Sequence, residues 1–248
     1  MRPPVPIRFL LPATVTLFLL ALLSPVPAVA QTCATRPAPA VVTVKTNLKT
    51  EVTREERSFN ELTRMFKTPG THPAGLYTGG FTIAQQARYH WTNNGREICV
   101  SVEAVEVTLT LTDPKIYVGR ELADDACTRE SVWRHEVLHY RIDQDVLERF
   151  TPIVQRALEF ALKQTGALVA KRESDVERIS ERLTRIIRQH LDRVSRDMQS
   201  DRDHLHERHD SREEYARTGA VCAHGHLGHS QPVLCASEPR LCTSLEQP

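Results

Sequence analysis

Glycine is scarce in this chain, at 10 of 248 residues. The sequence contains no glycine-rich phosphate-binding loop, and it has no GxSxG pattern of the kind that presents a nucleophilic serine. Composition and motifs therefore argue against chemistry that depends on a bound nucleotide or on a serine nucleophile.

A large net charge of either sign is also missing. The chain has 32 Lys and Arg residues against 31 Asp and Glu residues. If the first thirty residues are removed, Arg2 and Arg8 leave with them, and 30 basic residues face 31 acidic ones. A nearly neutral chain gives no support for nucleic-acid binding, which is usually marked by a basic domain or face.

Long apolar runs are limited to one, Phe9–Leu23, which follows two arginines and precedes the small-residue pattern Ala28-Val29-Ala30. The run is shorter than the roughly 20 apolar residues that span a bilayer, and Pro12 interrupts it. These features predict a signal peptide over residues 1–30, cleaved after Ala30. The mature protein is then expected to be periplasmic or secreted, with no membrane span.

The sequence has six cysteines, and in an exported protein these predict disulfides rather than free thiols. Six cysteines allow fifteen sets of three pairs, so spacing cannot assign them. Cys99 and Cys127, alone in the middle of the chain, are one expected pair. Two of the last three, Cys222, Cys235 and Cys242, could close a loop in the tail, while Cys33 stands near the start.

Strand patterns cluster between residues 41 and 119. The turn sequence Asn93-Asn94-Gly95 separates two strand-like segments and predicts a β-hairpin. In the second segment the apolar alternation changes parity, which predicts a β-bulge near Glu103 to Val105. Residues 41–46 are a further strand candidate, and a turn at Thr112–Pro114 would precede another strand over residues 115–119.

Helical patterns surround and follow these strands. Ser58 with Glu61 forms a capping-box pattern that begins a short helix over residues 58–66. A helix over about residues 129–149 is expected to begin at Asp125 or Thr128 and to kink or restart at Thr151-Pro152. Gly166 ends the next helical piece. Apolar residues then recur at mostly three- and four-residue spacing, which predicts packing against a partner helix, or a coiled coil that could mediate self-association.

These patterns predict an α+β fold: a small antiparallel sheet whose β-hairpin packs on a central helix, followed by a long C-terminal helical segment. The chain divides into a signal peptide (1–30), a linker (31–44), a catalytic-type domain (45–170), a long helix (171–218) and a Cys/His-rich tail (219–248).

The central helix contains WRHEVLHYRID, residues 133–143, an HExxH pattern. Residues four apart on a helix differ by about 40° around its axis, so His135 and His139 point from one face and can bind one zinc ion. The ion makes a water molecule more acidic, and Glu136 is placed to take its proton as a general base. This division of roles is what the hydrolysis of a peptide or protein substrate needs.

The sequence does not identify the third zinc ligand. Asp143 lies about 12 Å from His135 along the helix axis, so it is better read as an acid behind the ligands or as an ion-pair partner. Asp145 stands where some zinc proteases place their third ligand, but the turn glycine of those proteases is replaced by Ile142. The remaining candidates lie on other segments: Glu148, Glu159, Glu173, Glu177, Glu213 and Glu214.

The order of ERSFNELTRM, GGFTIAQQARYHWT, REICVSVEAVEVTLTLTDP and RHEVLHYRID resembles a bacterial family of predicted secreted zinc-dependent proteases, over about residues 45–170. The resemblance implies an α+β fold, zinc ligands at His135 and His139, and a catalytic acid/base at Glu136. Arg141 departs from the longer zinc-peptidase signature around HExxH, where an apolar residue is usual, and the family's aromatic-rich strand is only partly matched, by Tyr89 and Trp91. The chain also retains only a distorted form of the family's C-terminal pattern, in Tyr215, Thr218 and His224-Gly225.

Seven of the eleven histidines lie from His190 onward, grouped in HLHERHD (204–210) and CAHGHLGHS (222–230). Such tracts can bind metal ions weakly. The preferred interpretation is a solvated helix end and a polar tail. Two functions follow for the whole chain: an exported zinc peptidase, or a non-catalytic envelope protein that assembles through its helices and binds metal through its histidines.

Overall fold

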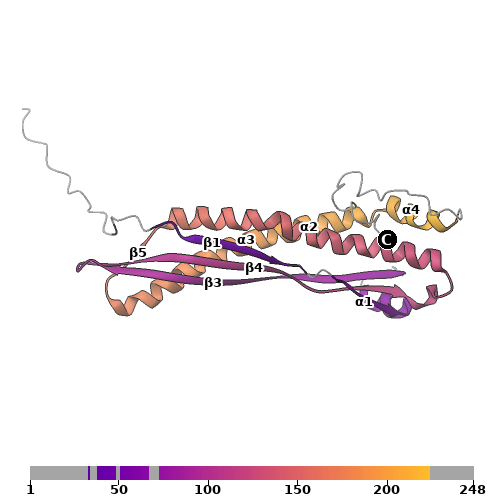
Figure 1. Cartoon of the computed structure of the whole chain (residues 1–248), viewed down its shortest axis with the longest axis horizontal. Coiled ribbons are helices and arrows are strands. Elements are labelled where there is room, and N and C mark those ends of the chain that lie inside the picture. Colours follow the sequence, from indigo (N-terminus) through magenta and orange to yellow (C-terminus); the bar gives the residue numbers. More distant parts are fainter. Residues whose placement is uncertain (1–32, 34–37, 49–50, 67–72, 224–248) are drawn as a thin grey trace, which may run out of the picture.

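The computed structural model describes residues 33, 38–48, 51–66 and 73–223, and one long strand, β4 (Ile98–Gly119), forms the centre of its sheet (Figure 1). A strand of 22 residues extends on the order of 70 Å, which gives the molecule its elongated shape. The predicted signal peptide, the tail beyond residue 223, and Cys235 and Cys242 lie outside the described residues.

The predicted β-hairpin is confirmed. Strand β3 (Gly75–Asn93) runs antiparallel to β4, and Gly95 takes φ of 83° in the turn between them, a value that glycine adopts without strain. The predicted bulge is also confirmed, because Arg88 pairs with Ala104 and Tyr89 with Val102, which leaves Glu103 as the extra residue on β4.

The prediction of an antiparallel sheet is wrong, because the sheet is mixed. Strands β1 (Val41–Asn47) and β2 (Thr53–Arg57) both run parallel to β4, while β3 and the short β5 (Leu168–Ala170) run antiparallel to it. The two strands of a hairpin point in opposite directions, so a further strand is parallel to one and antiparallel to the other. β1 and β2 lie beside β4 rather than β3, and nothing local in the sequence decides that choice.

The turn expected at Thr112–Pro114 is also absent, since β4 continues through these residues. Asp113 takes φ of 45° and the pairing shifts register here: Thr78 pairs with Lys115, and Gly80 pairs with Thr112. The turn-forming residues therefore produce an irregularity within one strand, held between its neighbours, rather than a reversal of the chain.

Four α-helices and two 3₁₀ turns complete the described fold. The capping box of α1 (Phe59–Phe66) is confirmed: the Ser58 backbone N–H donates to the Glu61 carboxylate at 2.8 Å, and Glu61 N–H donates to Ser58 Oγ at 3.3 Å. The remaining elements are η1 (Arg120–Leu122), α2 (Ala126–Thr165), η2 (Glu173–Asp175), α3 (Val176–His209) and α4 (Arg212–Ala223).

Helix α2 is capped by Asp125, whose side chain accepts from Thr128 N at 3.0 Å, and it ends at Gly166 with φ of 62°. Both boundaries follow the predicted signals. The restart expected at Thr151-Pro152 does not occur, because α2 is one helix of 40 residues that includes Pro152. Tertiary packing on both sides of Pro152, through the buried Phe150 and Val154, holds a helix that local propensity alone would interrupt.

Helices α2 and α3 form an antiparallel pair that packs on the sheet and shares one hydrophobic core with it (Figure 1). The predicted apolar stripe of α3 is buried, so its partner helix is α2 of the same chain. The buried apolar residues of α3 are Ile179, Leu183, Ile187, Leu191, Val194, Met198 and Leu205. Self-association through this segment stays a prediction.

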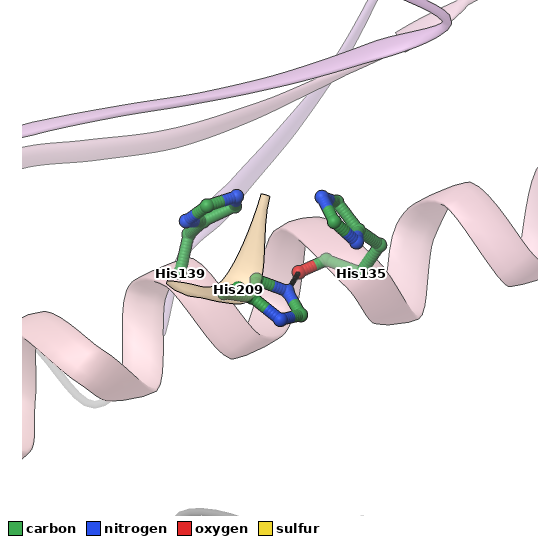
Figure 2. Close-up of side chains that lie close together, drawn as sticks. All are labelled: His135, His139 and His209. Atoms are coloured by element: carbon green, nitrogen blue, oxygen red, sulfur yellow. Dashed lines mark hydrogen bonds between the residues drawn. The ribbon is translucent and has the colours of Figure 1, made fainter. Parts of the chain in front are cut away.

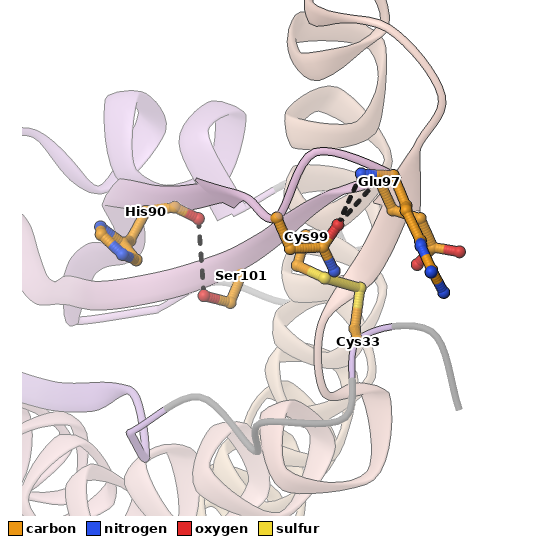
Figure 3. The surroundings of a disulfide bond; sticks show 7 residues. Cys33, His90, Glu97, Cys99 and Ser101 are labelled. Atoms are coloured by element: carbon orange, nitrogen blue, oxygen red, sulfur yellow. Dashed lines mark hydrogen bonds between the residues drawn. A yellow bond between two sulfur atoms is a disulfide. The ribbon is translucent and has the colours of Figure 1, made fainter. Parts of the chain in front are cut away.

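One disulfide joins Cys33 to Cys99 (Figure 3), and another joins Cys127 to Cys222. The expected Cys99–Cys127 pair is therefore wrong. Cys99 lies at the start of β4 and Cys127 lies beyond its end, so the full length of that strand separates them. Disulfides are compatible with an exported protein. Among the residues that the structure describes, no helix is both long enough and apolar enough to cross a membrane.

We expect Leu183→Ala to lower the free energy of unfolding by about 2–5 kcal/mol, because Leu183 is fully buried between α3 and the rest of the core. The neighbouring Arg182→Ala variant, on the exposed face of α3, should stay within about 0.5 kcal/mol of the wild type. Urea denaturation of the two variants measures this difference, and equal losses would contradict the packing of α3 described above.

Candidate metal centre

The HExxH segment lies in the first half of α2, with its two histidines turned toward the end of α3. His135 and His139 are each only 6 % exposed, and their ring centroids are 5.1 Å apart. The Tyr77 ring of β3 stacks near His139, at 6.4 Å. The amphipathic helix therefore buries both imidazoles in the interior, and neither projects into solvent.

A third imidazole reaches this position from the last residue of α3. Potential ligand atoms of His135, His139 and His209 all lie within 4.8 Å of one another, and all three residues are buried (Figure 2). Burial lowers the pKa of His139 to about 4 and that of His209 to about 2, so both rings are neutral near pH 7. Neutral imidazoles are the form that binds metal, so this buried group could bind a metal ion.

The next residue, Asp210, places a carboxylate oxygen between the two HExxH histidines. Its Oδ1 lies 3.2 Å from His135 Nε2 and 3.0 Å from His139 Nε2. Burial favours the neutral form of this carboxyl, but the contacts with the two imidazoles outweigh burial and lower its pKa below the usual range. Asp210 is therefore ionised when donors or a cation lie against it at this position.

A chain of hydrogen bonds determines which nitrogen of His139 carries the proton. His139 Nδ1 lies 2.7 Å from His206 Nδ1, and His206 Nε2 lies 2.8 Å from Asp143 Oδ1. Burial raises the pKa of Asp143, but hydrogen bonds from His206 and Arg202 prevail and lower it, so this carboxylate only accepts. A neutral His206 then donates through Nε2 to Asp143, and its Nδ1 accepts from His139 Nδ1–H.

This proton order places an unprotonated His139 Nε2 3.0 Å from Asp210 Oδ1. A cation between an imidazole nitrogen and a carboxylate oxygen attracts both atoms. A proton on Asp210 could serve only one of the two imidazoles, whereas a metal ion could bind both. Ligand atoms around a tetrahedral zinc ion, with bonds of about 2.0–2.1 Å, are about 3.3 Å apart, close to the separations seen here. The donor set therefore fits a metal ion.

His209 is held differently from the other two histidines. Its Nε2 donates to the backbone carbonyl of His135 at 3.0 Å, as Figure 2 shows, and its Nδ1 is buried without a hydrogen-bond partner. The first contact also ties the end of α3 to α2. His209 can therefore act as a support for the site or, through its free nitrogen, as an additional ligand.

Glu136 lies beside the histidines and against the backbone of β3. A Cβ atom at Gly75 would stand 2.8 Å from Glu136 Oε1, so only glycine lets the strand pass this close to the carboxylate. Burial raises the pKa of Glu136 to about 7 and Asp210 adds to the shift, whereas His135 and the Tyr77 backbone N–H oppose it. A carboxyl with this pKa can both accept and release a proton near neutral pH.

The structure brings His135, Glu136 and His139 together, as the motif requires, but places the predicted third-ligand carboxylates elsewhere. Asp143 does not lie beside the two Nε2 atoms. It accepts hydrogen bonds from Arg202, His206 and Tyr77, as expected for an acid that supports the histidines without contacting a metal. Asp145 pairs with Arg149. The group that could bind a metal here contains none of Glu148, Glu159, Glu173, Glu177, Glu213 and Glu214.

Sequence reasoning missed His206, His209 and Asp210, because the HLHERHD tract was interpreted as a solvated helix end. A usable signal was present. Leu205 lies seven residues after Met198, and His209 lies four residues after Leu205. Both spacings keep a residue on the same face of a helix, so His209 continues the buried stripe of α3. A histidine on the apolar face of a helix, with an acidic residue directly after it at the end of the helix, indicates a buried polar site that could bind a metal.

The chain matches no protein-family model, no curated protein and no solved structure. The geometry of the site is therefore the basis for inferring its function.

We expect His206→Ala to weaken metal binding roughly 10–100-fold, with Zn²⁺ as the probe ion, because the variant loses the group that fixes the protonation of His139. His204→Ala is the matched control, since His204 is exposed on the same helix. Competition with a chromophoric chelator gives both affinities. Unchanged affinity in His206→Ala would show that the hydrogen-bond chain has no part in holding the ion.

Proposed function

We propose that the protein is a zinc-dependent peptidase in which His135, His139 and Asp210 hold the ion and Glu136 moves the proton. One observation carries the proposal: a carboxylate oxygen of Asp210 lies 3.0 and 3.2 Å from the Nε2 atoms of two buried imidazoles. A metal ion between these three atoms would bind all of them at once.

The choice of zinc depends on Glu136, which lies beside the proposed ligands, as well as on the ligands themselves. Two imidazoles and one carboxylate also bind Fe(II) in oxygenases. A buried carboxyl with a pKa of about 7 directly beside the metal position has no role in that chemistry, whereas hydrolysis needs such a group. Zinc accepts the same nitrogen and oxygen donors, so the presence of Glu136 favours zinc and hydrolysis.

In this proposal, each residue has a separate task. Zinc, when bound, supplies Lewis acidity that polarises a carbonyl and makes water more acidic. Glu136 accepts a proton at its carboxylate and later releases it to the leaving amine. Asp143 and His206 keep His139 in the protonation state that binds metal, and Arg202 with Tyr77 holds Asp143 in place.

The third ligand can be identified by comparing two neighbouring residues. Asp210→Ala should weaken zinc binding by more than about 100-fold, because it removes a direct ligand. His209→Ala should have a smaller effect, because His209 Nε2 is engaged by the His135 carbonyl. Zinc affinity by chelator competition gives the ranking. A larger loss in His209→Ala would instead assign the third position to that ring.

Glu136→Gln tests the chemistry. The variant should lose roughly 10²–10⁴-fold in kcat/KM on a quenched fluorescent peptide library while it still binds one zinc per chain, because the amide cannot take the proton. Glu130→Gln is the matched control, since Glu130 lies on the exposed side of the same helix, where it pairs with Arg134. Hydrolysis that survives in Glu136→Gln would remove Glu136 as the general base.

A second candidate function follows from the third histidine. If His209 joined the other three donors through its free nitrogen, four protein ligands would enclose the ion, which is typical of a structural or storage site. The protein would then be a non-catalytic, metal-binding envelope protein. A zinc site with four protein ligands and no measurable peptide cleavage by the wild type would favour this candidate.

A further inference from the structure

The metal centre is largely buried in this structure. His135, Glu136 and His139 are each 6 % exposed. The Asp210 side chain is 34 % exposed, and the Tyr215 hydroxyl donates to its Oδ1 at 3.2 Å. A peptidase has to admit a polypeptide to these groups. If the proposed function holds, on which this inference rests, one of the elements that surround the site must be able to move.

Three elements surround the site along with α2: the start of β3, the end of α3, and α4. The first two belong to the framework, since residues of β3 and α3 are part of the hydrophobic core or pack against it. Helix α4 supplies no residue to that core among the described residues. Its one fully buried side chain is an acid, Glu214, and Tyr215 is half exposed. Apolar burial therefore contributes little to holding α4.

One covalent bond and several polar contacts join α4 to the rest of the protein. Cys222, near the end of α4, is bonded to Cys127 in the first turn of α2. Ser131 Oγ donates to Thr218 O at 3.2 Å, and the Tyr215 ring lies 5.3 Å from the ring of His135. The buried Glu214 pairs with Arg217 of the same helix. The disulfide is the covalent attachment of α4 to α2.

We propose that α4 is a cover over the metal centre, and that the Cys127–Cys222 disulfide keeps it closed. Figure 1 shows α4 lying along the first half of α2, the half that carries His135 and His139. With the disulfide intact, α4 stays over the ligands. Without it, α4 separates from α2 and exposes the site, while the framework of β3, α2 and α3 remains.

The natural opening reaction is reduction of this disulfide by a dithiol. Two electrons and two protons pass from the dithiol to the protein, the S–S bond breaks to give two cysteine thiols, and the dithiol becomes a disulfide. The second disulfide, Cys33–Cys99, joins the start of β4 to the N-terminal segment and provides a matched comparison.

The test measures the rate at which a strong chelator removes zinc from the full-length protein. The Cys127→Ala/Cys222→Ala variant should release zinc about 10-fold faster or more than the wild type, because the closed state loses its cross-link. The Cys33→Ala/Cys99→Ala variant should release zinc at the wild-type rate. Equal rates in the first variant and the wild type would overturn the proposal.

Two further measurements cover the cases in which that comparison fails. If the first variant does not fold, the Cys33→Ala/Cys99→Ala protein is compared before and after treatment with a phosphine reductant, which is oxidised to its oxide. Zinc release should accelerate on reduction, and an unchanged rate would contradict the cover.

If the protein binds no zinc, the proposed function fails but the cover can still be tested. Carbethoxylation of His135 and His139 in metal-free protein, read by mass spectrometry, should be faster without the Cys127–Cys222 bond. Equal modification rates would reject the cover. Neither readout depends on peptide cleavage, so the two proposals succeed or fail separately.

Discussion

The candidate metal centre depends on one buried carboxylate, Asp143, which is fully inaccessible and held by Arg202, His206 and Tyr77. An ionised carboxylate only accepts, so a neutral His206 donates to it and accepts from His139 Nδ1–H. His139 then presents an imidazole nitrogen with a free lone pair toward the oxygen of Asp210. In the proposed function, this network prepares His139 to bind a cation.

The packing of α2 against α3 makes this network possible. His135 and His209 are 74 positions apart in sequence, and they meet because a shared apolar seam, continued from Ile179 to Leu205, holds the two long helices in register. A shift by one helical turn, about 5.4 Å, would separate Asp143 from His206 and Asp210 from both imidazoles. The core residues of α3 therefore act on the site by fixing the position of this helix against α2.

Several features were predictable from the sequence because their signals are local. Asn93-Asn94-Gly95 specified the hairpin, the change of parity specified the bulge at Glu103, and the four-residue spacing of His135 and His139 placed both rings on one face. Features that depend on distant segments were not predictable. The direction of β1 and β2 depends on which hairpin strand they join, and the cysteine pairs depend on the length of β4. The proposed third ligand depends on how far α3 folds back along α2, which places Asp210 beside His135 and His139 instead of the candidate glutamates.

Zinc-edge anomalous diffraction from crystals of the full-length protein tests the central claim most directly, because it locates the ion and identifies its ligands in one map. The account predicts a single strong peak inside the chain, at about 2 Å from His135 Nε2, His139 Nε2 and an oxygen of Asp210. No peak between these three residues, with zinc found only among the histidines beyond residue 223, would contradict it. The HExxH helix would then be a structural helix whose histidines pair with Asp210.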